Sequence, residues 1–311
     1  KQFAEAVSVT KPAMVFTLAG NLLNILLNYI LIFGKLGFEP MGLMGAGWAT
    51  LISRIFMGVG LYWYIVRAKK FQVFSGFIRR PIKFEKGRWK QLSLLGFPIA
   101  LQFLLEGGAF SVGTIMMGWL GKIELAAHQI ALSLASFTFM TISGLAAATT
   151  IRVSNLYGEE NYPEMKKAAH ASYHLTFLFM ALCAIIFLVA QDFLPSLFID
   201  DQKVILTASG LLVLAAFFQI FDGLQVCAMS ALRGLGDVRV PTAIAFVSYW
   251  LISLPVGYGI AFHTGLGEKG IWIGFCAGLG TACLLLMPRF EFAANRLVKQ
   301  HPKKNQRQTT A

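Results

Sequence analysis

One acidic side chain stands alone in a long apolar stretch, within the segment FLLEGGAF at residues 103–110. This residue, Glu106, is the only charged residue between Lys90 and Lys122. At a helical rise of about 1.5 Å per residue it lies about 24 Å from Lys90, which is close to the middle of a bilayer. Since a charge at that depth costs about 2.5 to 3.5 kcal/mol on insertion scales, we interpret Glu106 as a functional residue.

A second isolated acid, Asp222, is the only charged residue between Lys203 and Arg233. It lies about 16 Å from Arg233 by the same rise, so the two acids can share one depth in a helix bundle. We expect no base inside either apolar stretch, and burial then favours a shared proton or one bound Na+. A cationic drug competes for the same negative charge, which is the chemistry of a coupling site. The alternative is structural, because a protonated carboxyl group can simply hydrogen-bond a neighbouring helix.

Amide and aromatic side chains accompany the acids at helical spacing. Gln102 precedes Glu106 by one turn on the same face, and Phe218 and Gln219 precede Asp222 by about one turn. The other candidate cavity residues are Gln129, Asn21 and Asn24. The amides either orient substrate and cation or bond between helices. The aromatic ring either stacks on a flat cation or packs in the core.

Two further acids, Asp200 and Asp201, fall in a connection on the predicted external side. They are candidates for an outer vestibule that attracts cations, and the alternative is a solvated loop.

The residues that position these groups form an all-α membrane protein. The chain has 311 residues, of which 56% are hydrophobic and 14% charged, with a mean hydropathy of +0.64. A soluble domain averages about a quarter charged residues. Eight apolar stretches are long enough to cross a membrane as helices. The predicted spans are residues 13–33, 45–66, 92–120, 125–150, 168–190, 204–231, 241–262 and 270–289.

The basic residues behind the net charge of +12 fall mostly on one predicted side of the membrane. Of the 27 Lys and Arg residues, 22 fall at the two termini and in every second connection, and 4 in the opposite connections. This is the positive-inside pattern, so we expect both termini to be cytoplasmic, in the inner membrane of a bacterium. A charge arranged in this way argues against nucleic acid as a partner. The sequence has no nucleophile–base pair, metal-ligand set or dinucleotide fingerprint, and we expect neither enzymatic activity nor a cofactor.

The chain also repeats itself weakly. Aligning Pro12 with Pro241 pairs Tyr29 with Tyr258, and both stretches lead into a Gly-rich span. Parallel repeats of this kind occur in transporters. By the repeat, the first two spans match the last two, so we expect a fragment that lacks roughly 140 N-terminal residues.

Three ordered stretches resemble the multidrug and toxic compound extrusion (MATE) family, in its NorM-type bacterial branch. NLLNILLNYILIFGKLGFEPMGLMGAGWAT at 21–50 looks like the fifth-to-sixth helix region. LAAHQIALSLASFTFMTISGLAAATTIRVSNLYG at 125–158 looks like the eighth helix, and FDGLQVCAMSALRGLGDVRVP at 221–241 like the tenth. Phe218 departs from the pattern, since some relatives have Tyr there.

The resemblance implies a twelve-helix fold of two six-helix lobes, with helices five to twelve in this chain. Residues 1–66 would then be the last two helices of the first lobe, and 91–290 the second lobe. Residues 67–90 would form a basic cytoplasmic linker and 291–311 a basic tail. Apolar linker residues would either lie on the membrane surface or be incidental. They are Phe71, Phe74, Phe77 and Ile78.

The resemblance also implies antiport of organic cations and other amphipathic drugs, driven by Na+ or H+, by a protein in the lipid bilayer that we expect to be a monomer. An alternative from the same superfamily is a flippase for a lipid-linked substrate, which an acidic cavity disfavours because such head groups are anionic. A receptor or scaffold without transport is the non-transport alternative. It predicts neither an internal repeat nor isolated acids.

Overall fold

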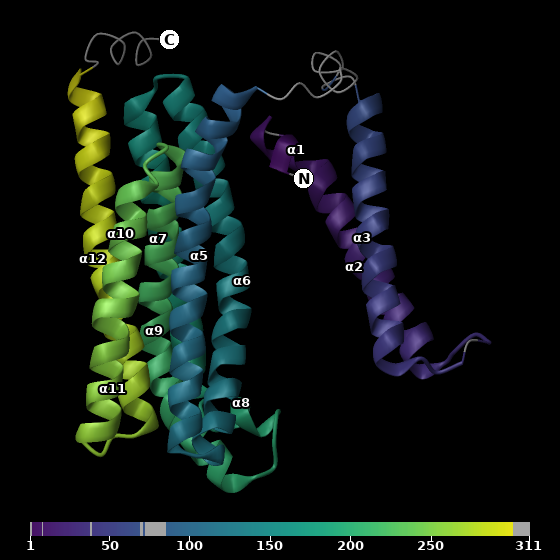
Figure 1. Ribbon diagram of the computed structural model, residues 1–311, viewed down its shortest axis with the longest axis vertical. Coiled ribbons are helices and arrows are strands. Elements are labelled where there is room, and N and C mark those ends of the chain that lie inside the picture. Colours follow the sequence, from purple (N-terminus) through teal and green to yellow (C-terminus); the bar gives the residue numbers. More distant parts are fainter. Residues whose placement is uncertain (1, 8, 38, 69–70, 72–84, 301–311) are drawn as a thin grey trace. The chain divides into compact units, whose positions relative to one another are not determined.

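The protein folds almost entirely into helices in the computed structural model, which describes residues 2–7, 9–37, 39–68, 71 and 85–300 (Figure 1). The chain divides into two compact units, residues 1–85 and 86–311. Eight helices in the described part are long and apolar enough to cross a membrane, so the predicted number of spans is confirmed.

The first unit consists of a helical hairpin with a short helix before it. The elements are α1 (Gln2–Ala6), α2 (Thr10–Phe33) and α3 (Gly42–Arg67). Phe71 is 1% exposed, with its ring 5.8 Å from that of Phe3 and 6.4 Å from that of Tyr64. Phe71 is therefore buried within this unit and does not face a membrane surface. The other apolar linker residues, Phe74, Phe77 and Ile78, lie outside the described part of the chain.

The second unit is a bundle arranged around α9. Its helices are α5 (Lys86–Leu120), α6 (Lys122–Gly158), α7 (Tyr162–Val189), α8 (Phe193–Ser196), α9 (Gln202–Gly234) and α12 (Glu268–Gln300). Its remaining span is built from α10 (Arg239–Phe246), the π-helix η2 (Val247–Ser253) and α11 (Leu254–His263). Helix α9 packs against α6, α7 and α12, which makes it the centre of the bundle (Figure 1).

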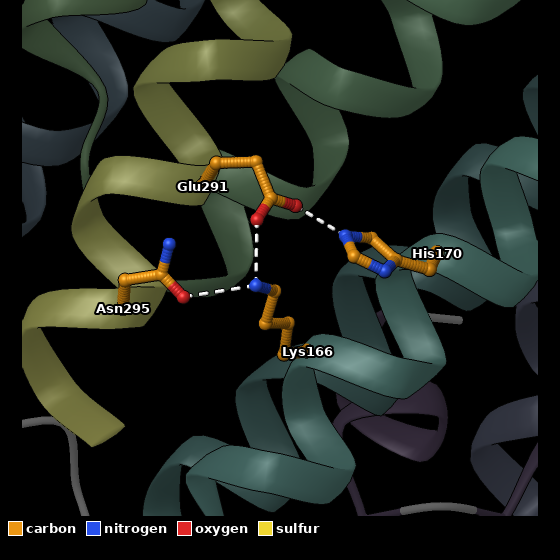
Figure 2. A network of polar contacts seen from close by, with 4 residues as sticks. All are labelled: Lys166, His170, Glu291 and Asn295. Atoms are coloured by element: carbon orange, nitrogen blue, oxygen red, sulfur yellow. Dashed lines mark hydrogen bonds and ion pairs between the residues drawn. The ribbon is translucent and has the colours of Figure 1, made fainter. Parts of the chain in front are cut away.

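Several helices extend beyond their predicted spans, α12 by the most, because the predictions stop near the first charged residue whereas the helices continue. Helix α12 continues past Arg289 to Gln300 and is held there by polar contacts with α7 (Figure 2). Lys166 Nζ lies 2.8 Å from Glu291 Oε2 and donates to Asn295 Oδ1 at 2.9 Å. His170 Nε2 contacts the other carboxylate oxygen of Glu291. The predicted tail therefore begins as helix, and residues 301–311 lie outside the described part.

Helix α12 approaches the seventh span so closely that a Cβ atom would clash at Gly270, Gly274 and Gly278. A Cβ atom added to Gly274 would lie 2.4 Å from Gly257 Cα and 2.6 Å from the Ser253 carbonyl oxygen. Small residues allow such contacts between membrane helices, where dispersion replaces the hydrophobic effect as the driving force. Gly280, on the same helix, faces open space and makes no such contact.

We expect Gly274→Ala to destabilise the full-length protein by about 1–3 kcal/mol, because the new methyl group meets backbone atoms that must shift. The matched control is Gly280→Ala, which should leave stability unchanged or slightly raised, since alanine is the better helix former. Thermal unfolding of the detergent-purified proteins measures both. Equal Tm values for the two variants would contradict the close packing of α12.

Candidate functional site

The two isolated acids face one cavity inside the second unit. Glu106 from α5 and Asp222 from α9 line a space of about 350 Å³, called here the acid cavity. Glu106 is half-buried and Asp222 is 5% exposed. The remaining lining residues come from α5, α6 and α9: Phe103, Gly107, Phe110, Leu132, Ala135, Ser136, Phe139 and Phe218. The cavity thus combines two acids with a mostly aromatic and aliphatic wall.

Few polar side chains lie close enough to Glu106 and Asp222 to form hydrogen bonds with them. Gln225, one turn beyond Asp222 on α9, donates from Nε2 to Glu106 Oε1 at 3.4 Å. The Tyr249 hydroxyl, from η2, faces both Glu106 and Gln225. Three buried oxygens have no hydrogen-bond partner within the described part of the chain: Asp222 Oδ1, Gln225 Oε1 and Tyr249 Oη. Such unpaired buried acceptors are rare in proteins and call for an explanation.

Tyr249 was not predicted from the sequence. It lies on a different span from either acid, and a tyrosine in an apolar stretch carries no signal of its own. Its place depends on the π-helix and on a neighbouring contact, in which Trp250 Nε1 donates to the Leu105 carbonyl oxygen at 3.0 Å.

A base also lies near the acids, although it falls just beyond the predicted span, which itself contains none. Arg233 and Glu106 both line a second cavity of about 260 Å³, called here the arginine cavity. Helix α9 continues to Gly234, beyond its predicted end, and so includes Arg233. Eleven residues are close to three helical turns, so Arg233 and Asp222 lie on one face of α9. Extending the predicted helix to Gly234 would have placed Arg233 on the same face as Asp222.

The guanidinium group of Arg233 is held by a buried amide. Arg233 Nη2 and Nε donate to Gln102 Oε1 at 2.7 and 3.2 Å. Gln102 Nε2 in turn donates to the Val238 carbonyl oxygen at 3.1 Å and to Thr242 Oγ1 at 2.9 Å. The guanidinium carbon also lies 4.9 Å from the centre of the Phe103 ring, a cation–π contact. Gln102 is therefore a link between α5, α9 and α10.

The other predicted residues of this unit lie in three different settings. Phe218 lines the acid cavity, with its ring 5.2 Å from that of Trp272. Gln219 is buried, and its Oε1 accepts a hydrogen bond from Thr138 Oγ1 at 3.1 Å. Gln129 is exposed on α6, one turn before the cavity residue Leu132. Their roles toward substrate stay predictions.

The predicted residues outside the bundle interior are placed as follows. In the first unit Asn21 is exposed and Asn24 is half-buried, with Asn24 Oδ1 accepting from Asn28 Nδ2 at 3.0 Å. Asp200 and Asp201 are exposed. Asp201 also caps α9, since its Oδ1 accepts from the Lys203 backbone N–H at 2.9 Å. A vestibule role for these acids stays a prediction.

Comparison with known proteins identifies related sequences and folds. Residues 98–259 match the MatE family model. The chain is 36% identical over 297 residues to the probable multidrug resistance protein NorM of Xylella fastidiosa (strain Temecula1), covering 96% of the chain and 63% of that protein. It is 38% identical over 275 residues to the NorM of Brucella suis biovar 1, covering 86% and 58%. The chain therefore spans about three-fifths of the length of these relatives.

Solved structures share the fold. The eukaryotic MATE transporter AtDTX14 matches with a TM-score of 0.83 and 23% identity, over 95% of this chain and 67% of that chain. An outward-facing multidrug resistance MATE family transporter of the MOP superfamily matches with a TM-score of 0.83 and 20% identity, over 94% and 64%. The predicted all-α membrane fold is confirmed, with eight spans of the twelve-helix, two-lobe MATE architecture in this chain.

We expect Gln102→Leu to destabilise the full-length protein by about 1–3 kcal/mol, because it leaves a half-buried guanidinium and a buried hydroxyl without their amide partner. Gln129→Leu removes the same amide from an exposed position, where its side chain makes no hydrogen bond within the described part, and should have little effect. Thermal unfolding in detergent compares the two. An unchanged Tm for Gln102→Leu would show that the Arg233–Gln102 contact contributes little.

Proposed function

The chain belongs to the multidrug and toxic compound extrusion (MATE) family, and from this premise we propose that the full-length protein exports organic cations and amphipathic drugs in exchange for Na+ or H+. It acts in the bacterial inner membrane with both termini of this chain cytoplasmic. Transport proceeds by alternating access, in which two lobes rock around a central substrate site.

One observation supports this proposal most directly: Glu106 and Asp222 face the same cavity among aromatic side chains. In a low-dielectric interior two adjacent carboxylates repel each other and lose hydration, so they favour a proton or a bound cation. The aromatic faces of Phe103 and Phe110 offer cation–π and stacking contacts to a flat organic cation. The same negative charge thus attracts both the coupling ion and the substrate.

The local charge balance supports a single coupling charge. With both acids ionised, the two cavities carry two negative charges and the one positive charge of Arg233. A deficit of one positive charge remains, which one proton, one Na+ or one monovalent drug can fill. This competition couples the two fluxes, because cation binding from outside lowers the affinity for drug and cation release restores it. A net acidic cavity also favours a cationic drug over an anionic lipid head group.

We expect Glu106→Gln and Asp222→Asn each to abolish gradient-driven drug uptake, because the amide cannot take up a coupling charge. Full-length protein in proteoliposomes, with Na+ and proton gradients imposed separately, measures this and names the coupling ion. Glu164→Gln is the matched control, since Glu164 is an exposed acid that pairs with Lys167 at 2.8 Å, and it should transport normally. Wild-type transport by the double amide variant would refute the coupling role.

We also expect the coupling ion to weaken drug binding by competition. The apparent Kd of a fluorescent cationic dye should rise in proportion to Na+ or H+ concentration once that ion exceeds its own Kd. In Asp222→Asn the dependence should flatten, because one of the two competing charges is gone. Equilibrium dye titrations on detergent-purified protein at several Na+ concentrations and pH values test this. A dye Kd that is independent of both ions would exclude direct competition and favour coupling at a separate site.

A further inference from the structure

We propose that Tyr249 is an oxygen ligand of the coupling cation, presented to the acid pair by the π-helical turn of the seventh span. This inference rests on the cation coupling proposed above and names Na+ as the ion. It adds a residue from a third helical segment, η2, to the acids on α5 and α9.

Unsatisfied oxygens surround the acid pair. Tyr249 is 3% exposed and Gln225 is fully buried, yet Tyr249 Oη and Gln225 Oε1 have no hydrogen-bond partner within the described residues, and neither has Asp222 Oδ1. Buried acceptors in proteins are seldom left unpaired, so three in one place indicate a shared partner. One bound cation would satisfy all three at once.

The chemistry of these groups suits an alkali cation. The Gln225 amide donates to Glu106 through its nitrogen at 3.4 Å, which leaves its oxygen free for another partner. The Tyr249 hydroxyl faces Glu106 and Gln225, and Asp222 lies one turn before Gln225 on the same helix. Two carboxylates alone leave coordination positions open, and away from water neutral protein oxygens must fill them. Ions such as Na+ are coordinated in transporters by oxygens exposed where helices are irregular.

The π-helix places Tyr249 at this point. A π-helical turn contains an extra residue, which rotates the following side chains relative to a regular helix, and such turns occur frequently at functional sites. The turn is fixed to α5 beside the acid, because Trp250 Nε1 donates at 3.0 Å to the carbonyl oxygen of Leu105, the residue before Glu106. A Cβ atom on Gly108 would lie 3.2 Å from the Trp250 ring, so a small residue there allows this contact. Adjacent residues on η2 thus meet adjacent residues on α5.

The test measures equilibrium binding of radioactive sodium to detergent-purified, full-length protein at alkaline pH. Tyr249→Phe removes one oxygen and keeps the ring, and it should raise the Kd for Na+ on the order of tenfold, the equivalent of one lost charge-assisted contact. Tyr173→Phe is the matched control. Tyr173 is also buried, its hydroxyl is also unpartnered, and it lies on α7 away from the acid cavity, so its variant should bind Na+ like wild type.

Dye affinity in Na+-free buffer shows whether Tyr249→Phe keeps its structure, and it should be unchanged. Wild-type Na+ binding by this variant would overturn the inference, as would a loss of dye affinity equal to the loss of Na+ affinity, which indicates a structural role. A wild-type protein that binds no Na+ but transports with a proton gradient would overturn the inference and leave the proposed antiport standing. If neither gradient drives transport, the proposed function itself fails.

Discussion

Two carboxyl groups lie inside one bundle of membrane helices, where they lose much of their hydration. The neighbouring side chains reduce the free-energy cost of burying these charges. A central charge in a membrane costs about 2.5 to 3.5 kcal/mol on insertion scales. Asp222 is on the central helix of the bundle, α9, and Glu106 lines the same cavity from α5. The described part of the chain contains no ion pair between either acid and a base. A mobile charge would offset their repulsion, which is the basis of the coupling role proposed for them.

Arg233 shows how the bundle keeps a fixed positive charge near the acids without neutralising them. Its guanidinium group lines a cavity together with Glu106, but its nitrogens bond to Gln102, and Gln102 bonds onward to α10. A guanidinium in direct contact with Glu106 would form a bidentate pair and remove the site for an exchangeable cation. Held at the arginine cavity, the same charge reduces the total repulsion and leaves the acid available. Gln102 thus determines where the positive charge lies.

Close backbone packing lets the irregular seventh span reach the acids. Gly274 brings α12 against the end of η2 and the start of α11, and Trp250 fixes η2 to α5. A π-helical turn has poorer local geometry than an α-helix, so contacts on both sides must stabilise it. The result is a tyrosine oxygen beside two carboxyl groups that belong to two other helices, α5 and α9.

The sequence alone determined the number of spans. Crossing a bilayer requires about 20 apolar residues, so each span is visible as a long apolar stretch. It also singled out Glu106 and Asp222, since a lone acid in an apolar stretch stands out without any knowledge of its neighbours. The ends of α6 and α12 were missed because Lys, Arg and Glu are good helix formers, and the contact of Lys166 with Glu291 holds the end of α12 against α7. Tertiary structure decided the roles of Gln102, Arg233 and Tyr249. Amides, arginines and tyrosines in helices are common, and only the rotation and packing of three helical segments determine which of them meet the acids.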